Sequence, residues 1–171
     1  MIVNALSHAL PAGMPDAPGG RVIGQAHYFP FRVYYEDTDL SGVVYHANYL
    51  SYFERARSDL LRVLGVDQRA AIEAGEGAYA VADLTIRYVS PARLDDQVVV
   101  RTRIDALGAA SANMCQMAFR NDDLLAAAKV RVGFVTPEGR PRRQPAAWRA
   151  AFDNFLAGNF PPPATTDTSE A

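Results

Sequence analysis

The chain has 171 residues, a formal net charge of −2, 49% hydrophobic residues and 21% charged residues. These values suit one globular domain with a single core. The basic residues are scattered, apart from Arg140, Arg142 and Arg143. This argues against a nucleic acid as partner, because duplex binding depends on clustered cations.

The compartment is predicted from the chain's single cysteine and from the absence of export signals. Cys115 is the only cysteine, and a chain without an internal disulfide fits a reducing compartment. Its apolar surroundings predict a buried structural thiol rather than a nucleophile. No segment resembles a secretory signal or is apolar and long enough to span a bilayer. We therefore expect a cytoplasmic protein.

Proline and glycine divide the chain into three parts. Residues 1–26 are rich in both and are predicted to form a flexible leader. Residues 27–140 are expected to form the folded domain. Residues 141–171 read as a C-terminal extension, with a short helix at about 145–157 and a disordered tail.

The folded domain begins with a strand, a polar loop and a helix. Residues 28–35 are aromatic and β-branched and read as a strand, and a glycine-containing loop follows at 36–42. Apolar residues at helical spacing predict a long amphipathic helix over 48–64. Asn48 is the expected N-cap, and Gly65 is the expected stop.

Four further strands are predicted at 80–89, 98–105, 113–120 and 127–135. The short turns between them indicate an antiparallel meander. Because the long helix is the natural cover for the apolar face of this sheet, we expect an α+β fold in which a curved five-stranded sheet wraps around it. Such a sheet leaves an edge strand open, which predicts pairing between subunits.

The densest set of chemically useful side chains lies just before the long helix, at residues 34–49. Asp37, Asp39 and His46 lie around Gly42 in this segment. A helix N-terminus presents unpaired N–H groups that suit a developing oxyanion, and a carboxylate placed across a turn could face a carbonyl held there. This pattern favours acyl transfer. The alternative is that both aspartates simply bond to nearby backbone.

The residues around this segment resemble those of a known family. Asp39-x-x-Gly42-Val43-Val44-Tyr45-His46-Ala47-Asn48-Tyr49, with Arg32–Thr38 before it, is similar to the signature of the 4-hydroxybenzoyl-CoA thioesterase family. The segments Tyr52–Ser58 and Tyr88–Asp96 strengthen the resemblance, which covers roughly residues 27–140. It is nearest to the acyl-CoA thioesterase branch associated with the Tol-Pal envelope system.

The resemblance implies a hotdog fold, in which a sheet wraps around a central helix, and a site in which Asp39 is the catalytic carboxylate. It also implies that the backbone N–H of His46 polarises the thioester carbonyl. Asp37 is given a supporting role. The resemblance further places Gly42, Val43, Tyr45 and Asn48 in the substrate site. Neither a metal nor a cofactor is implied, and the oligomer is expected to be a homodimer or homotetramer.

Several alternatives stay open. Asp39 either attacks the thioester carbon or activates water. The protein could instead be a non-catalytic module that binds acyl-CoA or an acyl-carrier protein. A dehydratase is a weaker alternative, because His27 resembles the histidine of hotdog dehydratases but is not followed by their glycine-rich segment. Glu54 on the helix is interpreted as pairing with Arg55, Arg57 or a group of a partner subunit. The acyl group cannot be read from the sequence. Candidates for holding the nucleotide part of CoA are named by charge alone: Arg87, Arg93 and 140–143.

Overall fold

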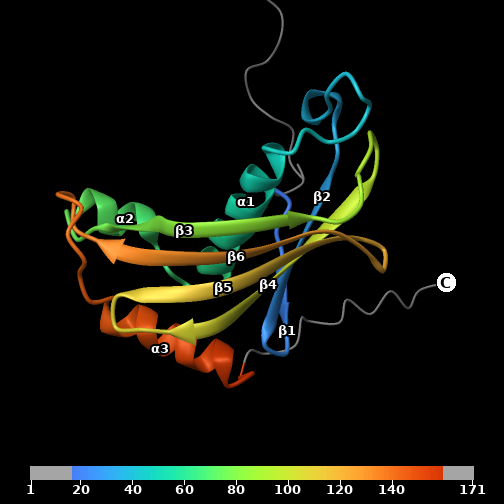
Figure 1. Cartoon of the computed structure of the whole chain (residues 1–171). Coiled ribbons are helices and arrows are strands. Elements are labelled where there is room, and N and C mark those ends of the chain that lie inside the picture. The colour runs from blue at the N-terminus through green and yellow to red at the C-terminus, as the bar shows by residue number, and fades with distance from the viewer. Residues whose placement is uncertain (1–16, 160–171) are drawn as a thin grey trace, which may run out of the picture.

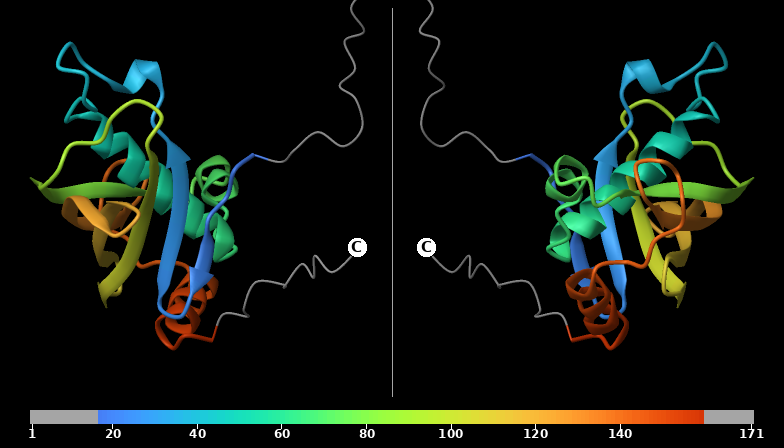
Figure 2. Two further views of the ribbon diagram at one scale, coloured as in Figure 1. Left: turned by 90° about the vertical axis from the view of Figure 1, so that its right-hand side faces the viewer. Right: turned by 90° about the vertical axis from the view of Figure 1, so that its left-hand side faces the viewer.

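The computed structural model describes residues 17–159. Within them, six strands form one antiparallel sheet in the order β1-β2-β4-β5-β6-β3. The sheet curves around helix α1 (Figures 1 and 2), as predicted. The strands are β1 (Arg21–Ile23), β2 (Ala26–Arg32), β3 (Ala78–Tyr88), β4 (Gln97–Leu107), β5 (Ser111–Arg120) and β6 (Asp123–Val135). None of the helices in residues 17–159 is long and apolar enough to cross a membrane.

The sixth strand is β1, which lies inside the segment predicted to be a leader. It pairs with β2 through a tight turn, with Val22 opposite His27. The ordered fold therefore begins earlier than residue 27. Residues 1–16, which make up most of the predicted leader, and the predicted tail from residue 160 lie outside the described residues.

Helix α1 (Asn48–Val63) occupies the predicted span within one residue. Its apolar stripe is buried against the concave face of the sheet, and Gly65 follows its C-terminus in the left-handed conformation, at φ +75°. The predicted cap was wrong. Ala47 is the N-cap, and Asn48 is the first helical residue. The Asn48 amide instead donates to the Asp37 carbonyl (2.9 Å), because the preceding loop folds back over the helix start.

Strand β3 lies where the predicted meander does not place it. It pairs with β6 (Ala78 opposite Val135, Tyr88 opposite Ala126) at the sheet edge far from β2. The segment 89–96 after it crosses to β4, so only β4, β5 and β6 form a meander. A bulge between Val81 and Asp83 interrupts its register with β6.

The two faces of β5 are the reverse of what hydrophobicity suggests. Met114, Gln116 and two alanines face the core. Cys115 lies with Met117 and Phe119 on the convex face and is half-buried. The prediction of a buried structural thiol was therefore wrong about its surroundings, although burial still raises the pKa of the thiol.

Two more helices complete the domain. Helix α2 (Gln68–Glu73) follows α1 and is capped by the Asp67 side chain, which accepts from Ala70 N–H. Helix α3 (Ala146–Leu156) agrees with the helix predicted at 145–157. Phe152 and Phe155 of α3 are fully buried in the main core.

The concave face is left open beside β3. Val81 and Tyr88 keep 50% and 44% of their surface exposed, although both point to the side that α1 covers elsewhere. Leu50 on the neighbouring helix is also exposed, at 42%. The outer edge of β3 has no strand beside it in residues 17–159. Exposed apolar side chains therefore lie along this border of the domain.

Candidate active site

The loop before α1 is organised by Asp37, one of its few buried polar residues. The Asp37 carboxylate accepts the N–H of Tyr34 (2.8 Å), and its carbonyl accepts the N–H of Tyr45 (2.9 Å) and the amide of Asn48. These bonds tie the single 3-10 turn η1 (Tyr35–Asp37) to the start of the helix. Asp37 thus makes the kind of backbone contacts expected of a supporting residue.

Asp39 begins a tight turn that ends at Gly42. The Gly42 N–H donates to the Asp39 carbonyl (2.9 Å), and the Asp39 N–H donates to the Val43 carbonyl (3.0 Å). Gly42 has φ +73°, a backbone conformation that favours glycine. The turn directs the Asp39 side chain outward, where it is exposed.

The Asp39 carboxylate is held in its ionised form. Its Oδ1 accepts the hydroxyl and the N–H of Ser41, the latter at 2.8 Å. These two bonds, together with the nearby His46, lower the pKa of Asp39 below its ordinary value. A carboxylate ionised throughout the neutral range can act as a nucleophile or as a base.

His46, the expected oxyanion donor at the helix N-terminus, lies two residues ahead of Asn48, the first helical residue. Its backbone N–H donates to no acceptor within residues 17–159. Its carbonyl accepts the hydroxyl of Tyr88 (3.0 Å), and its ring lies edge-on to the Tyr88 ring, with centroids 6.2 Å apart. The His46 N–H is therefore free for a ligand, and Tyr88 fixes the peptide that follows it.

The predicted site residues line two neighbouring hollows rather than one. Asp39 and Gly42 line an open depression of about 590 Å³ with Leu40 and Leu94. His46 and Val43 line an apolar hollow of about 300 Å³, with Tyr49, Tyr88, Val89 and Pro91 among its other walls. Tyr45 and Asn48 line neither hollow; they hold the loop together. Within residues 17–159 the carboxylate and the segment before the helix line adjacent hollows and share no enclosed cavity.

The segment 89–96 supports this loop from outside and was noticed in the sequence only through the family resemblance. The Ala92 carbonyl accepts the N–H of Val44 (2.8 Å), and Arg93 reaches the carbonyl of Gly42 (3.4 Å). Asp96 is paired with Arg120 at 2.9 Å. The role of Tyr88 was missed, because no local pattern reveals a hydroxyl that bonds to a carbonyl 42 residues earlier.

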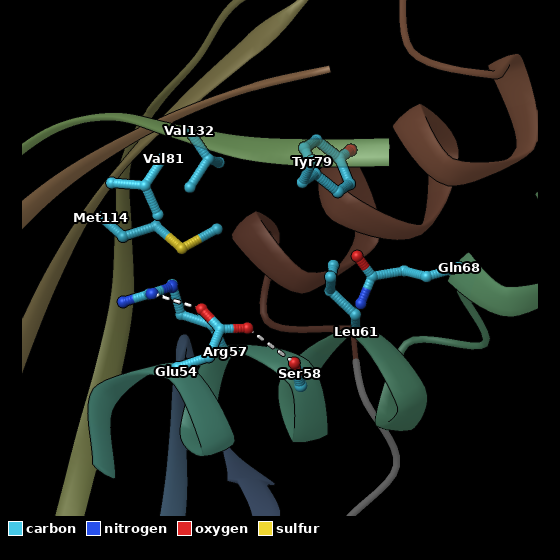
Figure 3. A pocket seen from close by; sticks show the side chains of 9 residues that line it. All are labelled: Glu54, Arg57, Ser58, Leu61, Gln68, Tyr79, Val81, Met114 and Val132. Carbon is cyan, nitrogen blue, oxygen red and sulfur yellow. Dashed lines mark hydrogen bonds and ion pairs between the residues drawn. The ribbon is translucent and has the colours of Figure 1, made fainter. Parts of the chain in front are cut away.

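Glu54 lies in a separate cavity of about 40 Å³ between α1 and the sheet (Figure 3). Its carboxylate accepts from Arg57 and from the hydroxyl of Ser58. Arg57 is buried and also donates to Gln116 (2.7 Å). The expected pairing of Glu54 with an arginine is confirmed, with Arg57 and not Arg55 as the partner.

His27 is also structural. It is fully buried, and its Nε2 lies 2.9 Å from Asp59, which in turn accepts the N–H of Gly20 (2.7 Å) and pairs with Arg62 (3.0 Å). Burial lowers the pKa of His27, although Asp59 opposes the shift. His8 lies outside the described residues. No cluster of metal-ligating side chains occurs within residues 17–159.

Comparison with known proteins identifies the class. Residues 41–127 match the model of the family described as the thioesterase superfamily. The chain belongs to this family.

Two curated relatives and one solved structure extend the identification. The chain is 42% identical over 128 residues to a Haemophilus influenzae protein named acyl-CoA thioesterase YbgC, covering 74% of this chain and 94% of that one. It is 40% identical over 126 residues to the acyl-CoA thioester hydrolase YbgC of Escherichia coli O157:H7, covering 72% and 93%. A probable thioesterase from Bartonella henselae superposes with a TM-score of 0.67 at 39% identity, over 70% of this chain and 99% of that one.

The fold extends to more distant proteins. A 1,4-dihydroxy-2-naphthoyl-CoA thioesterase from Synechocystis gives a TM-score of 0.71 at 23% identity, over 75% of this chain and 96% of that one. At this identity the likeness concerns the fold alone. The hotdog prediction is confirmed, with six strands instead of five.

Proposed function

We propose that this protein is an acyl-CoA thioesterase that cleaves acyl-CoA into a free acid and CoA. The family and the curated relatives support this activity. One observation in the structure supports a role for specific atoms in this activity. An ionised Asp39 carboxylate and the free N–H of His46 lie on either side of the turn at Gly42, at the start of a buried helix. These are the two groups that acyl transfer needs.

In the proposed reaction, the thioester oxygen accepts a hydrogen bond from His46 N–H, which stabilises the negative charge that develops there. Asp39 then acts in one of two ways. Either its carboxylate attacks the carbonyl carbon, expels CoA as a thiolate and leaves a mixed anhydride for water to hydrolyse, or it takes a proton from the attacking water. Both routes consume one water and yield the same products.

The working unit we propose is a dimer joined along β3, with a tetramer built from two dimers. An exposed edge strand pairs readily with another strand, and the apolar surface beside β3 includes Val81 and Tyr88. A second copy would bury this surface. It would also close the open side of the hollow beside His46, because Tyr88 lines that hollow. Sedimentation that finds a monomer at micromolar concentration would refute the dimer.

The direct test compares Asp39→Asn with wild type in a thiol-release assay on a panel of acyl-CoAs. We expect a fall in kcat of about a hundredfold or more, since the carboxylate acts in the bond-making step. Glu36→Gln is the matched control: it removes an exposed carboxylate from the same loop and should leave turnover intact. Equal turnover by Asp39→Asn and wild type would remove Asp39 from the mechanism.

A carrier-protein thioester is a second candidate substrate. The chain is 30% identical over 148 residues to an Arabidopsis thaliana protein named acyl-acyl carrier protein thioesterase ATL3, over 85% of this chain and 77% of that one. Higher kcat/KM on an acyl-carrier protein than on the matching acyl-CoA would favour it. Tight binding of both without hydrolysis would instead favour a non-catalytic module. A cytoplasmic location is proposed on the ground of the single thiol.

A further inference from the structure

The turn between β6 and α3, residues 136–143, concentrates positive charge on a fixed backbone. We call it the arginine turn. The Thr136 N–H donates to the carbonyl of Arg140, and the Gly139 N–H to that of Thr136, both at 2.8 Å. Arg142 donates to the carbonyl of Glu76 (2.6 Å). Arg140, Arg142 and Arg143 are all exposed.

The guanidinium groups of this turn have no carboxylate partner within residues 17–159. Glu138 is the acidic residue in the turn itself, and its pKa is lowered by the Thr136 hydroxyl. The turn therefore carries three positive charges against one negative charge. Arginines with unused donors on an ordered backbone are suited to phosphate groups, which they bind through two parallel hydrogen bonds.

The catalytic end of the same subunit lacks a comparable cluster of arginines. Three of its guanidinium groups are already engaged: Arg93 with the Gly42 carbonyl, Arg120 with Asp96 and Arg32 with a loop carbonyl. Arg55 and Arg87 are exposed and have no carboxylate partner within residues 17–159, but they stand singly on α1 and β3. The catalytic loop itself is acidic; it contains Glu36, Asp37 and Asp39. The phosphates of a CoA thioester bound at Asp39 would therefore meet single free arginines from this end, and no group of arginines on one turn.

Within one subunit the arginine turn lies too far away to help. It follows Val135, which pairs with Ala78 at the start of β3, whereas the catalytic loop is tied to Tyr88 at the end of β3. The 11 residues of β3 span roughly 35 Å at about 3.4 Å per residue. Figure 1 shows the two ends: the arginine turn lies beside α2, and the catalytic loop lies at the opposite end of β3.

In a dimer whose two-fold axis passes between paired β3 edges, the arginine turn of one subunit lies near the catalytic loop of the other. Strands related by such an axis run antiparallel, so the start of one β3 lies beside the end of the other. We propose that the arginine turn of one subunit binds the phosphate groups of the CoA whose thioester is cleaved at Asp39 of the other subunit. The pantetheine arm spans the interval between the two. This inference rests on the proposed function and on the proposed dimer.

The first test uses the double variant Arg140→Ala/Arg143→Ala, which leaves the Arg142 contact with Glu76 in place. KM for acyl-CoA should rise about tenfold or more, since charge-assisted hydrogen bonds are lost, with little change in kcat. The corresponding acyl-pantetheine has the same thioester and no nucleotide, so its kcat/KM should not change. Arg103→Ala removes an exposed arginine from β4 and serves as the control. An unchanged KM for acyl-CoA, or equal losses on both substrates, would overturn the proposal.

The second test asks which subunit supplies the arginines. Asp39→Asn chains and Arg140→Ala/Arg143→Ala chains are produced together with different affinity tags, and the hybrid is purified. If the turn serves the other subunit, one site of the hybrid carries both defects and the other carries none. The hybrid then shows half the wild-type kcat with the wild-type KM. If the turn serves its own subunit, the surviving site keeps the raised KM, and the proposal is wrong. Full activity of Asp39→Asn alone would instead remove Asp39 from the mechanism, and a wild-type protein that hydrolyses no acyl-CoA would refute the proposed function.

Discussion

The Arg57–Gln116 pair offers a quantitative test of how α1 is held against the sheet. Gln116 is fully buried; its carbonyl oxygen accepts from Arg57 (2.7 Å), and its amide donates to the Phe53 carbonyl (2.9 Å) and to the Thr102 hydroxyl (3.0 Å). Replacing Gln116 with Met keeps a similar volume and removes all three bonds. The largest loss falls on Arg57, which is only 6% exposed.

The expected cost follows from these contacts. An unmatched hydrogen bond to a buried charge costs about 2–3 kcal/mol, and the Thr102 hydroxyl adds about 1 kcal/mol. Gln116→Met should therefore lower the free energy of unfolding by about 3–4 kcal/mol, a large part of the roughly 5–15 kcal/mol typical of a domain. Arg57→Met should cost a similar amount, because it leaves the Gln116 oxygen without its donor.

The double variant distinguishes this explanation from simple loss of packing. Replacing both partners with apolar groups of similar size can be nearly neutral. The double variant should therefore be at least about 1.5 kcal/mol more stable than the sum of the single changes predicts. Urea unfolding at one fixed protein concentration measures this, since the concentration affects the apparent stability of a dimer. Additive losses within about 0.5 kcal/mol would refute the reasoning.

Three further predictions concern the site. Ser41→Ala removes the hydroxyl bond to Asp39 and keeps the backbone N–H bond. Because the hydroxyl bond favours the ionised carboxylate, the pKa of Asp39 should rise and the acid limb of the kcat/KM profile should move to higher pH; an unmoved limb would mean that another group controls it. Tyr88→Phe removes one exposed hydrogen bond, between two neutral groups, to the His46 carbonyl. It should lower kcat by about two- to tenfold and leave the thermal stability unchanged. An unchanged kcat would show that this hydrogen bond does not position the peptide. Val81→Lys places a charge among the exposed apolar side chains beside β3. It should shift the sedimentation coefficient toward that of a monomer, and activity should fall in parallel. A fully active dimer would contradict the proposed interface.

The elements that could be predicted from the sequence are those whose pattern is local. Helix α1 was placed within one residue because its apolar spacing and Gly65 mark its span. The position of β3 could not be predicted, because strand order depends on which edge the crossover 89–96 reaches. The core side of β5 was obscured for a physical reason: Gln116 faces inward to bind Arg57, while apolar Met117 lies outside.

The candidate site shows the same division. Asp39, Gly42 and His46 lie within eight residues, so a motif could identify them together. Tyr88 supports His46 from a strand far along the chain, and the arginine turn acquires its proposed role only through the pairing of two subunits. Contacts of this kind depend on topology, which a single sequence does not reveal.

The hydrophobic core extends well past the segment that the family model matches. Residues 41–127 include α1 and β3 to β5 but omit β2, the end of β6 and α3. A protein trimmed to that segment would expose the edge of β4 that pairs with β2 and would lose the fully buried Phe152 and Phe155. The smallest portion able to fold independently must therefore reach from about Gly20 to α3. The Gly20 N–H donates to the same Asp59 carboxylate that contacts the buried His27. Swapping sequences between relatives at the limits of the matched segment would divide a cooperative unit, and exchanges at residues 20 and 157 should be better tolerated.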